Sequence, residues 1–123
     1  MTLREGVGRI GSLRYTARDL ATRARSKSLR PEDVQGGTFT LNNTGALGSI
    51  AGLSIINQPQ AAILSTEAIK KRAVVVDDSV VIRPMMNLTM SFDHRIVDGL
   101  AASRFLNHVQ RGIEEWSPAT IKL

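Results

Sequence analysis

Apolar positions recur at helical spacing near both ends of the chain. The first stretch begins after Ser12, which we expect to be the N-cap of a helix. It ends before Pro31, because a proline disfavours helix in the residue before it. Its apolar positions are Leu13, Ala17, Leu20, Ala21 and Ala24, and its opposite face carries Arg14, Arg18, Arg23 and Arg25. The second stretch follows Asp98-Gly99 and continues to Pro118, with apolar positions at Ala101, Phe105, Val109, Gly112, Ile113 and Trp116. The pattern therefore predicts two amphipathic helices.

Between these helices the pattern is that of β-structure. Runs of β-forming residues predict strands at residues 38–41, 61–65, 73–76, 79–82 and 85–92. Asp77-Asp78 separates two of these runs by two residues, which is the spacing of a β-hairpin. Residues 50–60 have no clear period and predict a loop. The order of elements is therefore helix, mostly strands, then helix.

The predicted strands need more cover than two helices supply. Residues 73–76 are apolar on both faces, so they require a packed layer on each side. We expect either that the protein oligomerises over an exposed sheet or that part of its fold lies outside this chain.

Composition narrows the chemistry. The 123 residues, 42% hydrophobic and 22% charged, favour one globular domain. Without cysteine there is no disulfide, thiol nucleophile or Cys-type zinc site, and two histidines leave little for another metal site, so we expect no metal. Neither a membrane-spanning apolar run nor a signal-peptide layout is present, so a soluble cytoplasmic protein with no membrane partner is expected.

The net charge of +5 is concentrated at the N-terminus. Residues 1–30 carry eight Lys and Arg against two acidic residues, whereas the remainder is nearly balanced. Such a basic segment could attract nucleic acid or a phosphorylated ligand, although a solvated helix face explains it more simply. With only 4% aromatic residues, no base-stacking surface is visible, so we expect no nucleic-acid partner.

One segment, residues 91–99, combines groups that can act together in proton transfer. His94 stands between a predicted strand and a helix start, with Asp93 and Asp98 on either side and Arg95 next to it. An imidazole accepts a proton near neutral pH, which makes His94 a candidate general base. The alternative is a histidine that merely satisfies the end of a strand.

The sequence Asp93-His94-Arg95-x-x-Asp98-Gly99 resembles the signature of the dihydrolipoamide acyltransferases, the core subunits of the 2-oxo acid dehydrogenase complexes. Residues 36–45, 55–64 and 84–88 are similar to further segments of that family, in the same order. The resemblance runs from about Ser12 to Trp116.

The resemblance implies an α+β fold of the chloramphenicol acetyltransferase type, a two-layer sandwich with a mixed sheet covered by helices. It covers only the C-terminal half of the family's catalytic domain, so this chain is expected to be a partial domain. We expect residues 1–11 to be an N-terminal lead and residues 12–123 to form the half-domain. The lipoyl domain and the small subunit-binding domain then lie outside this chain.

The implied function is transfer of an acyl group between dihydrolipoamide and coenzyme A, at a site between neighbouring subunits of a trimer. The expected participants are coenzyme A as substrate and a lipoyl group on a separate domain. The expected partners are further copies of the chain, building a larger core, and the decarboxylase and dihydrolipoamide dehydrogenase subunits of the complex. The alternative is a truncated, non-catalytic piece that only assembles the core. Acetyl, succinyl and branched-chain enzymes share these motifs, which leave the acyl group and the core symmetry open.

The resemblance also assigns roles to residues. His94 takes the proton of the attacking thiol, and Asp98 holds the site in shape. Asn42 stands where the family usually has a Ser or Thr hydroxyl that stabilises the oxyanion, and an amide can donate there as well. Thr44 is the reserve donor. Without the resemblance, Asn42-Asn43 would be interpreted as ordinary turn residues. The expected supporting residues are Ser91, Asp93, Arg95 and Thr44.

Overall fold

A computed structural model describes the backbone of residues 10–117 and the side chains of residues 16–117. These residues form two compact units, residues 10–38 with 115–117 and residues 39–114. The expected lead over residues 1–11 lies almost wholly outside the described residues, as do Pro118 and the side chains of Leu13 and Arg14.

Helix α1 (Ile10–Arg25) begins and ends earlier than the sequence predicts. Ser12 lies inside the helix, so its assignment as the N-cap is wrong. The helix stops because Lys27 adopts a left-handed backbone with φ of 56°. The N–H of Ser28 then donates to the carbonyl of Arg23 at 2.9 Å, and that of Lys27 to Ala24 at 3.2 Å. This is a Schellman cap with lysine in the place usually taken by glycine.

A short 3₁₀ helix, η1 (Pro31–Val34), is tied to α1 within the same unit. The carboxylate of Asp33 accepts the backbone N–H of Arg30 at 2.9 Å and forms an ion pair with Arg23. These contacts, the Arg30 N–H first, hold the pKa of Asp33 well below its usual range. Arg23 also pairs with Asp19 one turn earlier at 2.9 Å, so part of the basic excess of this helix is neutralised locally.

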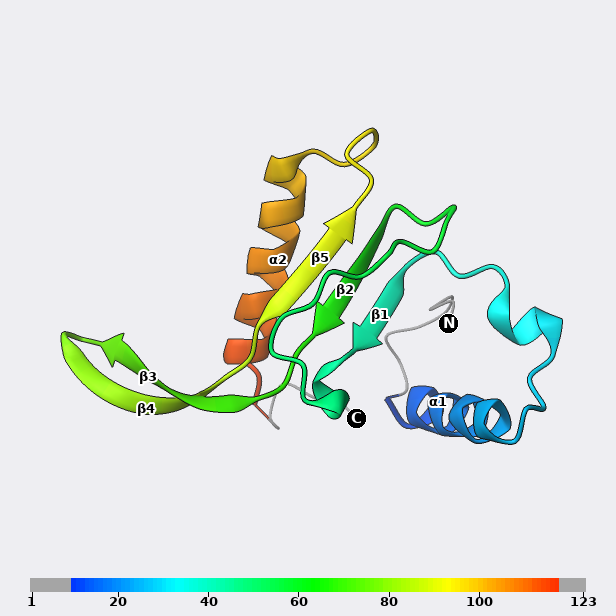
Figure 1. Cartoon of the computed structure of the whole chain (residues 1–123), viewed down its shortest axis with the longest axis horizontal. Helices are drawn as coiled ribbons and strands as arrows, with labels where there is room; N and C mark the ends of the chain where they lie inside the picture. The colour runs from blue at the N-terminus through cyan, green and yellow to red at the C-terminus, as the bar shows by residue number, and fades with distance from the viewer. Residues whose placement is uncertain (1–9, 118–123) are drawn as a thin grey trace. The chain divides into compact units, whose positions relative to one another are not determined.

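The second unit contains a three-stranded mixed sheet (Figure 1). Its strands are β1 (Thr40–Asn43), β2 (Ala62–Thr66) and β5 (Leu88–Phe92). The central strand, β2, pairs in parallel with β1 and antiparallel with β5. All of Ala62, Ile63, Leu64 and Ser65 are buried, so β2 is the core of the unit.

The strand register separates the sheet into two faces of different polarity. Side chains alternate along a strand, and paired residues point to the same face. One face carries Thr40 and Asn42 on β1, Ile63 and Ser65 on β2, and Thr89 and Ser91 on β5. The other carries mainly apolar residues, among them Leu41, Ala62, Leu64, Leu88, Met90 and Phe92. The first is called the polar face below.

Helix α2 (Gly99–Glu114) packs against β5 and lies on the apolar side (Figure 1). Its Phe105 ring lies 5.8 Å from that of Phe39, which alternates with Leu41 and so shares the apolar face. Ala102, 4% exposed, is the most buried residue of the helix. The helix stops before Trp116, which the sequence pattern placed on its apolar stripe. The second predicted helix is therefore confirmed, with an earlier end.

The predicted hairpin is confirmed and is longer than expected. Strands β3 (Lys70–Val76) and β4 (Ser79–Met85) pair around Asp77 and Asp78, whose φ values of 47° and 59° are those of a type I′ turn. The hairpin forms a separate two-stranded ribbon that extends away from the sheet (Figure 1). Its side chains lack the cover that the sequence pattern demanded: Val80 is 74% and Ile82 72% exposed.

The strand predicted over residues 85–92 is shorter than expected: β5 begins at Leu88, and residue 85 instead ends β4. The chain changes partner here, because β4 belongs to the ribbon and β5 to the sheet. Asn87 fixes the crossing: its carbonyl accepts the N–H of Glu67 at 3.2 Å, and its Nδ2 donates to the carbonyl of Ile50 at 2.6 Å. Strand β1 is also shifted, beginning at Thr40 rather than residue 38.

The connection after β1 passes directly over the end of β2. It starts with a 3₁₀ turn, η2 (Gly45–Leu47), and continues without regular structure to β2, as predicted for residues 50–60. A Cβ atom on Gly45 would lie 2.4 Å from the carbonyl carbon of Glu67. Only glycine permits this approach.

Within the described residues, no helix combines the length and apolarity needed to cross a membrane.

This packing predicts opposite effects of one methyl group at two glycines. We expect Gly45→Ala to destabilise the complete catalytic domain by about 1–3 kcal/mol, because the backbone of Glu67 cannot move aside easily. Gly112→Ala is the matched control: its Cβ would meet nothing within 4 Å, and alanine favours the helix by about 1 kcal/mol. Thermal and urea unfolding of both variants measure the difference. A Gly45→Ala protein as stable as wild type would contradict the close approach.

Candidate active site

Asn42 projects from β1 onto the polar face, where it meets two serines. Its Nδ2 lies 3.2 Å from the Oγ of Ser54 and 3.4 Å from the Oγ of Ser65, and the two serine oxygens are 2.7 Å apart. Ser65 comes from β2 and is 1% exposed, whereas Ser54 comes from the connection after β1 and is half-buried. Asn42 is therefore part of a fixed polar cluster as well as of a strand end.

The neighbouring Thr44 serves a buried carboxylate. Its hydroxyl donates to Oε2 of Glu67 at 2.6 Å, and the hydroxyl of Thr89 on β5 donates to Oε1 at 3.5 Å. Glu67 is 2% exposed, yet these donors, Thr44 first, with Ser49 and the Gly52 N–H, outweigh burial and lower its pKa. The carboxylate stays ionised and holds the connection against the sheet. The Thr44 proton is thus used inside the protein, which suits a supporting role better than that of reserve donor.

The segment after β5 is a compact turn between the sheet and α2. Backbone N–H groups of Ile96 and Val97 donate to the carbonyl of Asp93 at 3.1 and 3.0 Å. Nε of Arg95 donates to the Asp93 carboxylate at 2.9 Å, which lowers the pKa of Asp93 to about 2. Arg95 therefore forms an ion pair with Asp93.

Asp98 caps α2. Its Oδ1 accepts the backbone N–H of Ala101 at 2.7 Å, which makes Asp98 the N-cap of this helix. Both carboxylates that flank His94 in the sequence thus have other partners, Asp93 the guanidinium of Arg95 and Asp98 the first turn of the helix. Their shared effect is to fix the turn that presents His94.

His94 itself is exposed at the tip of this turn. Its ring lies 5.4 Å from that of Phe92, centroid to centroid, at an angle of 42°. The imidazole therefore contacts an aromatic ring and is also exposed to solvent. Ser91, one residue before Phe92, pairs with Ile63 and lies on the polar face, nearer to His94 than the Asn42 cluster.

His94 and Asn42 are not brought together within one chain. Asn42 is in register with Ser65 and through it with Thr89, whereas the β5 strand reaches Phe92 before the turn to His94 begins. The three residue steps from Thr89 to Phe92 span about 10 Å along the strand, and β1 and β5 are separated by about 10 Å across the sheet. No hydrogen bond or single reacting atom could bridge the two within this chain.

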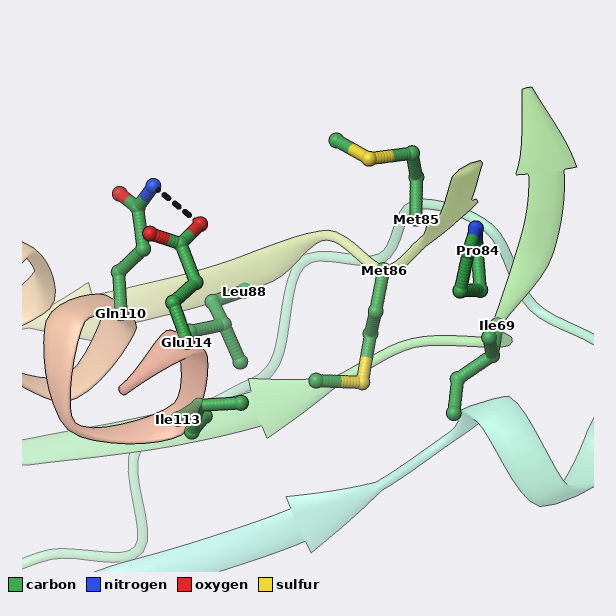
Figure 2. Close-up of a pocket in the computed structure, with 8 residues that line it drawn as sticks. All are labelled: Ile69, Pro84, Met85, Met86, Leu88, Gln110, Ile113 and Glu114. Atoms are coloured by element: carbon green, nitrogen blue, oxygen red, sulfur yellow. Dashed lines mark hydrogen bonds between the residues drawn. The ribbon is translucent and has the colours of Figure 1, made fainter. Parts of the chain in front are cut away.

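An apolar pocket exists elsewhere in this unit, and none of the expected site residues lines it. It lies where the β3–β4 ribbon meets the end of α2, with a volume of about 260 Å³. Figure 2 shows its lining: Ile69, Pro84, Met85, Met86, Leu88, Gln110, Ile113 and Glu114. Across the described part of the chain, no group of three or more His, Asp or Glu side chains is arranged to hold a metal ion.

Sequence reasoning missed Ser54, Ser65 and Glu67. Each lies in a stretch without a motif, and each acquires its role through contacts with residues 11 to 23 positions away. A signal for Glu67 was present, because a carboxylate directly after an apolar strand needs partners if it is buried.

The chain is similar in sequence to known proteins. Residues 8–121 match the family described as 2-oxoacid dehydrogenases acyltransferase (catalytic domain). The lipoamide acyltransferase component of the branched-chain alpha-keto acid dehydrogenase complex of Bacillus subtilis is 51% identical over 96 residues, which are 77% of this chain and 23% of that protein.

Two solved structures extend the likeness to three dimensions. The probable dihydrolipoamide acetyltransferase of Listeria monocytogenes superposes with a TM-score of 0.84 and 46% identity, over 89% of this chain and 47% of that chain. The dihydrolipoamide acetyltransferase of Azotobacter vinelandii gives 0.78 and 36%, over 82% and 42%. That second structure concerns the role of one serine, one histidine and one asparagine in catalysis.

The match of 8–121 covers most of this chain, and the three-dimensional likeness confirms the α+β fold. The chain spans about a quarter of the curated relative's length and about half of each solved chain. The chain therefore belongs to the family of 2-oxoacid dehydrogenase acyltransferase catalytic domains and is a part of such a domain.

Proposed function

We propose that this chain contributes to a coenzyme A-dependent dihydrolipoamide acyltransferase within a 2-oxo acid dehydrogenase complex. The observation that carries the proposal is the presentation of His94, by Asp93-His94-Arg95 and the Asp98 cap, at the end of a sheet strand in a member of this family. Dihydrolipoamide arrives on a separate lipoyl domain, and coenzyme A is the second substrate. The decarboxylase and dihydrolipoamide dehydrogenase subunits are the proposed partners.

Residue spacing supports the assignment of His94, Asn42 and Asp98. In the Azotobacter vinelandii enzyme the serine of interest precedes the histidine by 52 residues, and the asparagine follows it by four. Asn42 and Asp98 stand at the same distances from His94. This chain would then differ at both flanking positions, with asparagine in place of serine and aspartate in place of asparagine.

The chemistry begins with the thiol. A thiol with a pKa near 8.5 is mostly protonated at pH 7, so His94 removes its proton and becomes an imidazolium. The thiolate sulfur attacks the thioester carbonyl carbon, a C–S bond forms and the carbonyl electron pair moves to oxygen. Donors at the Asn42 cluster stabilise this oxyanion. When the carbonyl reforms, the other C–S bond breaks and the leaving thiolate takes the proton back from His94.

The separation of His94 and Asn42 within one chain supports a site completed by a second subunit. A cyclic trimer repeats one heterologous contact, so the His94 end of one copy can face the Asn42 end of the next. The exposed valines and isoleucine of the β3–β4 ribbon supply apolar surface for such contacts. We infer a homo-oligomer on these grounds, with trimers as building blocks of a larger core.

The first test removes the base. In a complete catalytic domain we expect acyl transfer from an acyl-coenzyme A to dihydrolipoamide, and we expect His94→Ala to lower it by about 10² to 10⁴, the usual contribution of a positioned acid or base. The variant should regain rate as the pH rises toward the pKa of the thiol. His108→Ala, on an exposed position of α2, is the matched control and should leave transfer unchanged.

Two outcomes would contradict this assignment. If His94→Ala lowered the melting temperature while the transfer rate stayed normal, His94 would serve only the end of the strand. If the wild-type domain assembled but transferred no acyl group from acetyl-, succinyl- or branched-chain acyl-coenzyme A, the chain would belong to a protein that only assembles the core and has no catalytic function.

The second test removes the side-chain amide of Asn42, which belongs to the proposed oxyanion site. Asn42→Ala should reduce turnover by about 10² to 10³, because the polar cluster loses the amide that organises it. Asn42→Ser places the family's usual hydroxyl there and should keep substantial activity. Steady-state kinetics in a complete catalytic domain measure both. Equal turnover of wild type and Asn42→Ala would place the oxyanion site elsewhere.

A further inference from the structure

The Asn42 cluster is a closed triangle of hydrogen-bonding atoms. The amide nitrogen of Asn42 and the hydroxyl oxygens of Ser54 and Ser65 are mutually 3.2, 3.4 and 2.7 Å apart. Each corner comes from a different element: β1, the connection after β1, and β2. Three separate segments of the chain therefore fix the position of every atom in the triangle.

Counting protons decides which group can serve a substrate. The two serine oxygens are only 2.7 Å apart and lie in nearly the same direction from the Asn42 nitrogen, whereas the two N–H bonds of a primary amide diverge by about 120°. One N–H of Asn42 therefore faces both serines, and the other is directed away from them. The two serines together have two hydroxyl protons, and the bond between them uses one. One hydroxyl proton thus remains to be donated outside the triangle.

Burial decides which serine donates it. Ser65 is 1% exposed and lies inside the sheet, so a substrate cannot approach it. Ser54 is half-buried and lies on the connection that covers the polar face. With Ser65 donating to Ser54, the Ser54 oxygen accepts two hydrogen bonds, one from Ser65 and one from Asn42. Accepting these bonds polarises its own O–H and makes it a stronger donor.

We propose that the Ser54 hydroxyl is an oxyanion donor of this protein beside the Asn42 amide, and that Ser65 is a positioning residue that holds it. The proposal rests on the proposed acyl transfer. As the thiolate sulfur forms its C–S bond and the carbonyl electron pair moves to oxygen, the Ser54 O–H donates to that oxygen without transferring its proton. The bond is released when the carbonyl reforms and the leaving thiolate recovers its proton from His94.

The hydroxyl that the family usually carries at position 42 is in this way replaced by one at position 54. The replacement stands about 3 Å from the Asn42 nitrogen, so the donor stays on the same part of the polar face. An asparagine at position 42 can contact both hydroxyls with one N–H and still has a second N–H to donate, whereas a serine there has a single proton.

The experiment compares hydroxyl removal with hydroxyl retention in a complete catalytic domain. We expect Ser54→Ala to lower kcat by about 10² to 10³ with little change in the KM for acyl-coenzyme A, because the donor acts mainly in the transition state. Ser54→Thr keeps the hydroxyl and should keep most of the activity. Ser103→Ala, an exposed serine on α2, is the control and should behave as wild type.

A rescue variant separates a donor from a structural serine. In the Ser54→Ala background, Asn42→Ser returns one hydroxyl to the same region and should restore a large part of the lost kcat. Unchanged kcat in Ser54→Ala would overturn the proposal while leaving acyl transfer intact. A loss that Asn42→Ser does not restore, accompanied by a lower melting temperature, would also overturn it, since Ser54 would then act through folding. Absence of transfer by wild type would refute the proposed function, and this inference with it.

Discussion

Strand β2 is enclosed on both faces, and its two faces need different partners. Ala62 and Leu64 point to the apolar face, the side on which α2 lies, whereas Ser65 and the residue after the strand, Glu67, have polar partners. A buried carboxylate without donors costs several kcal/mol, so Glu67 requires the hydroxyls of Thr44 and Thr89 and the close backbone approach at Gly45. This requirement determines the path of the whole connection between β1 and β2.

The need to satisfy the buried Glu67 carboxylate also positions the Asn42 cluster. The connection that is held by Glu67 carries Ser54 to the polar face, beside Asn42. The His94 end is positioned independently, by the Asp93–Arg95 ion pair and the cap of α2 at the far end of β5. In the proposed function, two ends that are each fixed and cannot meet within one chain form a site only when two copies associate. On that proposal, oligomerisation is a condition of catalysis rather than an addition to it.

Sequence reasoning recovered the elements whose signals are local. The hairpin followed from two valine-rich runs around Asp77-Asp78, and the position of His94 from its neighbours in the sequence. The end of α1 was missed because Lys27 adopts a left-handed backbone conformation, which a lysine in the sequence does not indicate. The roles of Glu67 and Ser54 were missed because they depend on hydrogen bonds between segments far apart in the chain, which periodicity cannot reveal.

The central claim is that the catalytic site is shared between subunits, and subunit mixing tests it most directly. Two complete catalytic domains, one carrying His94→Ala and the other Asn42→Ala, are inactive alone and are unfolded together, refolded as mixed oligomers and assayed for acyl transfer. If His94 of one subunit acts with the Asn42 cluster of its neighbour, random mixing in trimers should return about a quarter of wild-type activity, because that fraction of contacts pairs two intact ends. Mixed oligomers, verified by mass, that remained as inactive as either parent would contradict the account.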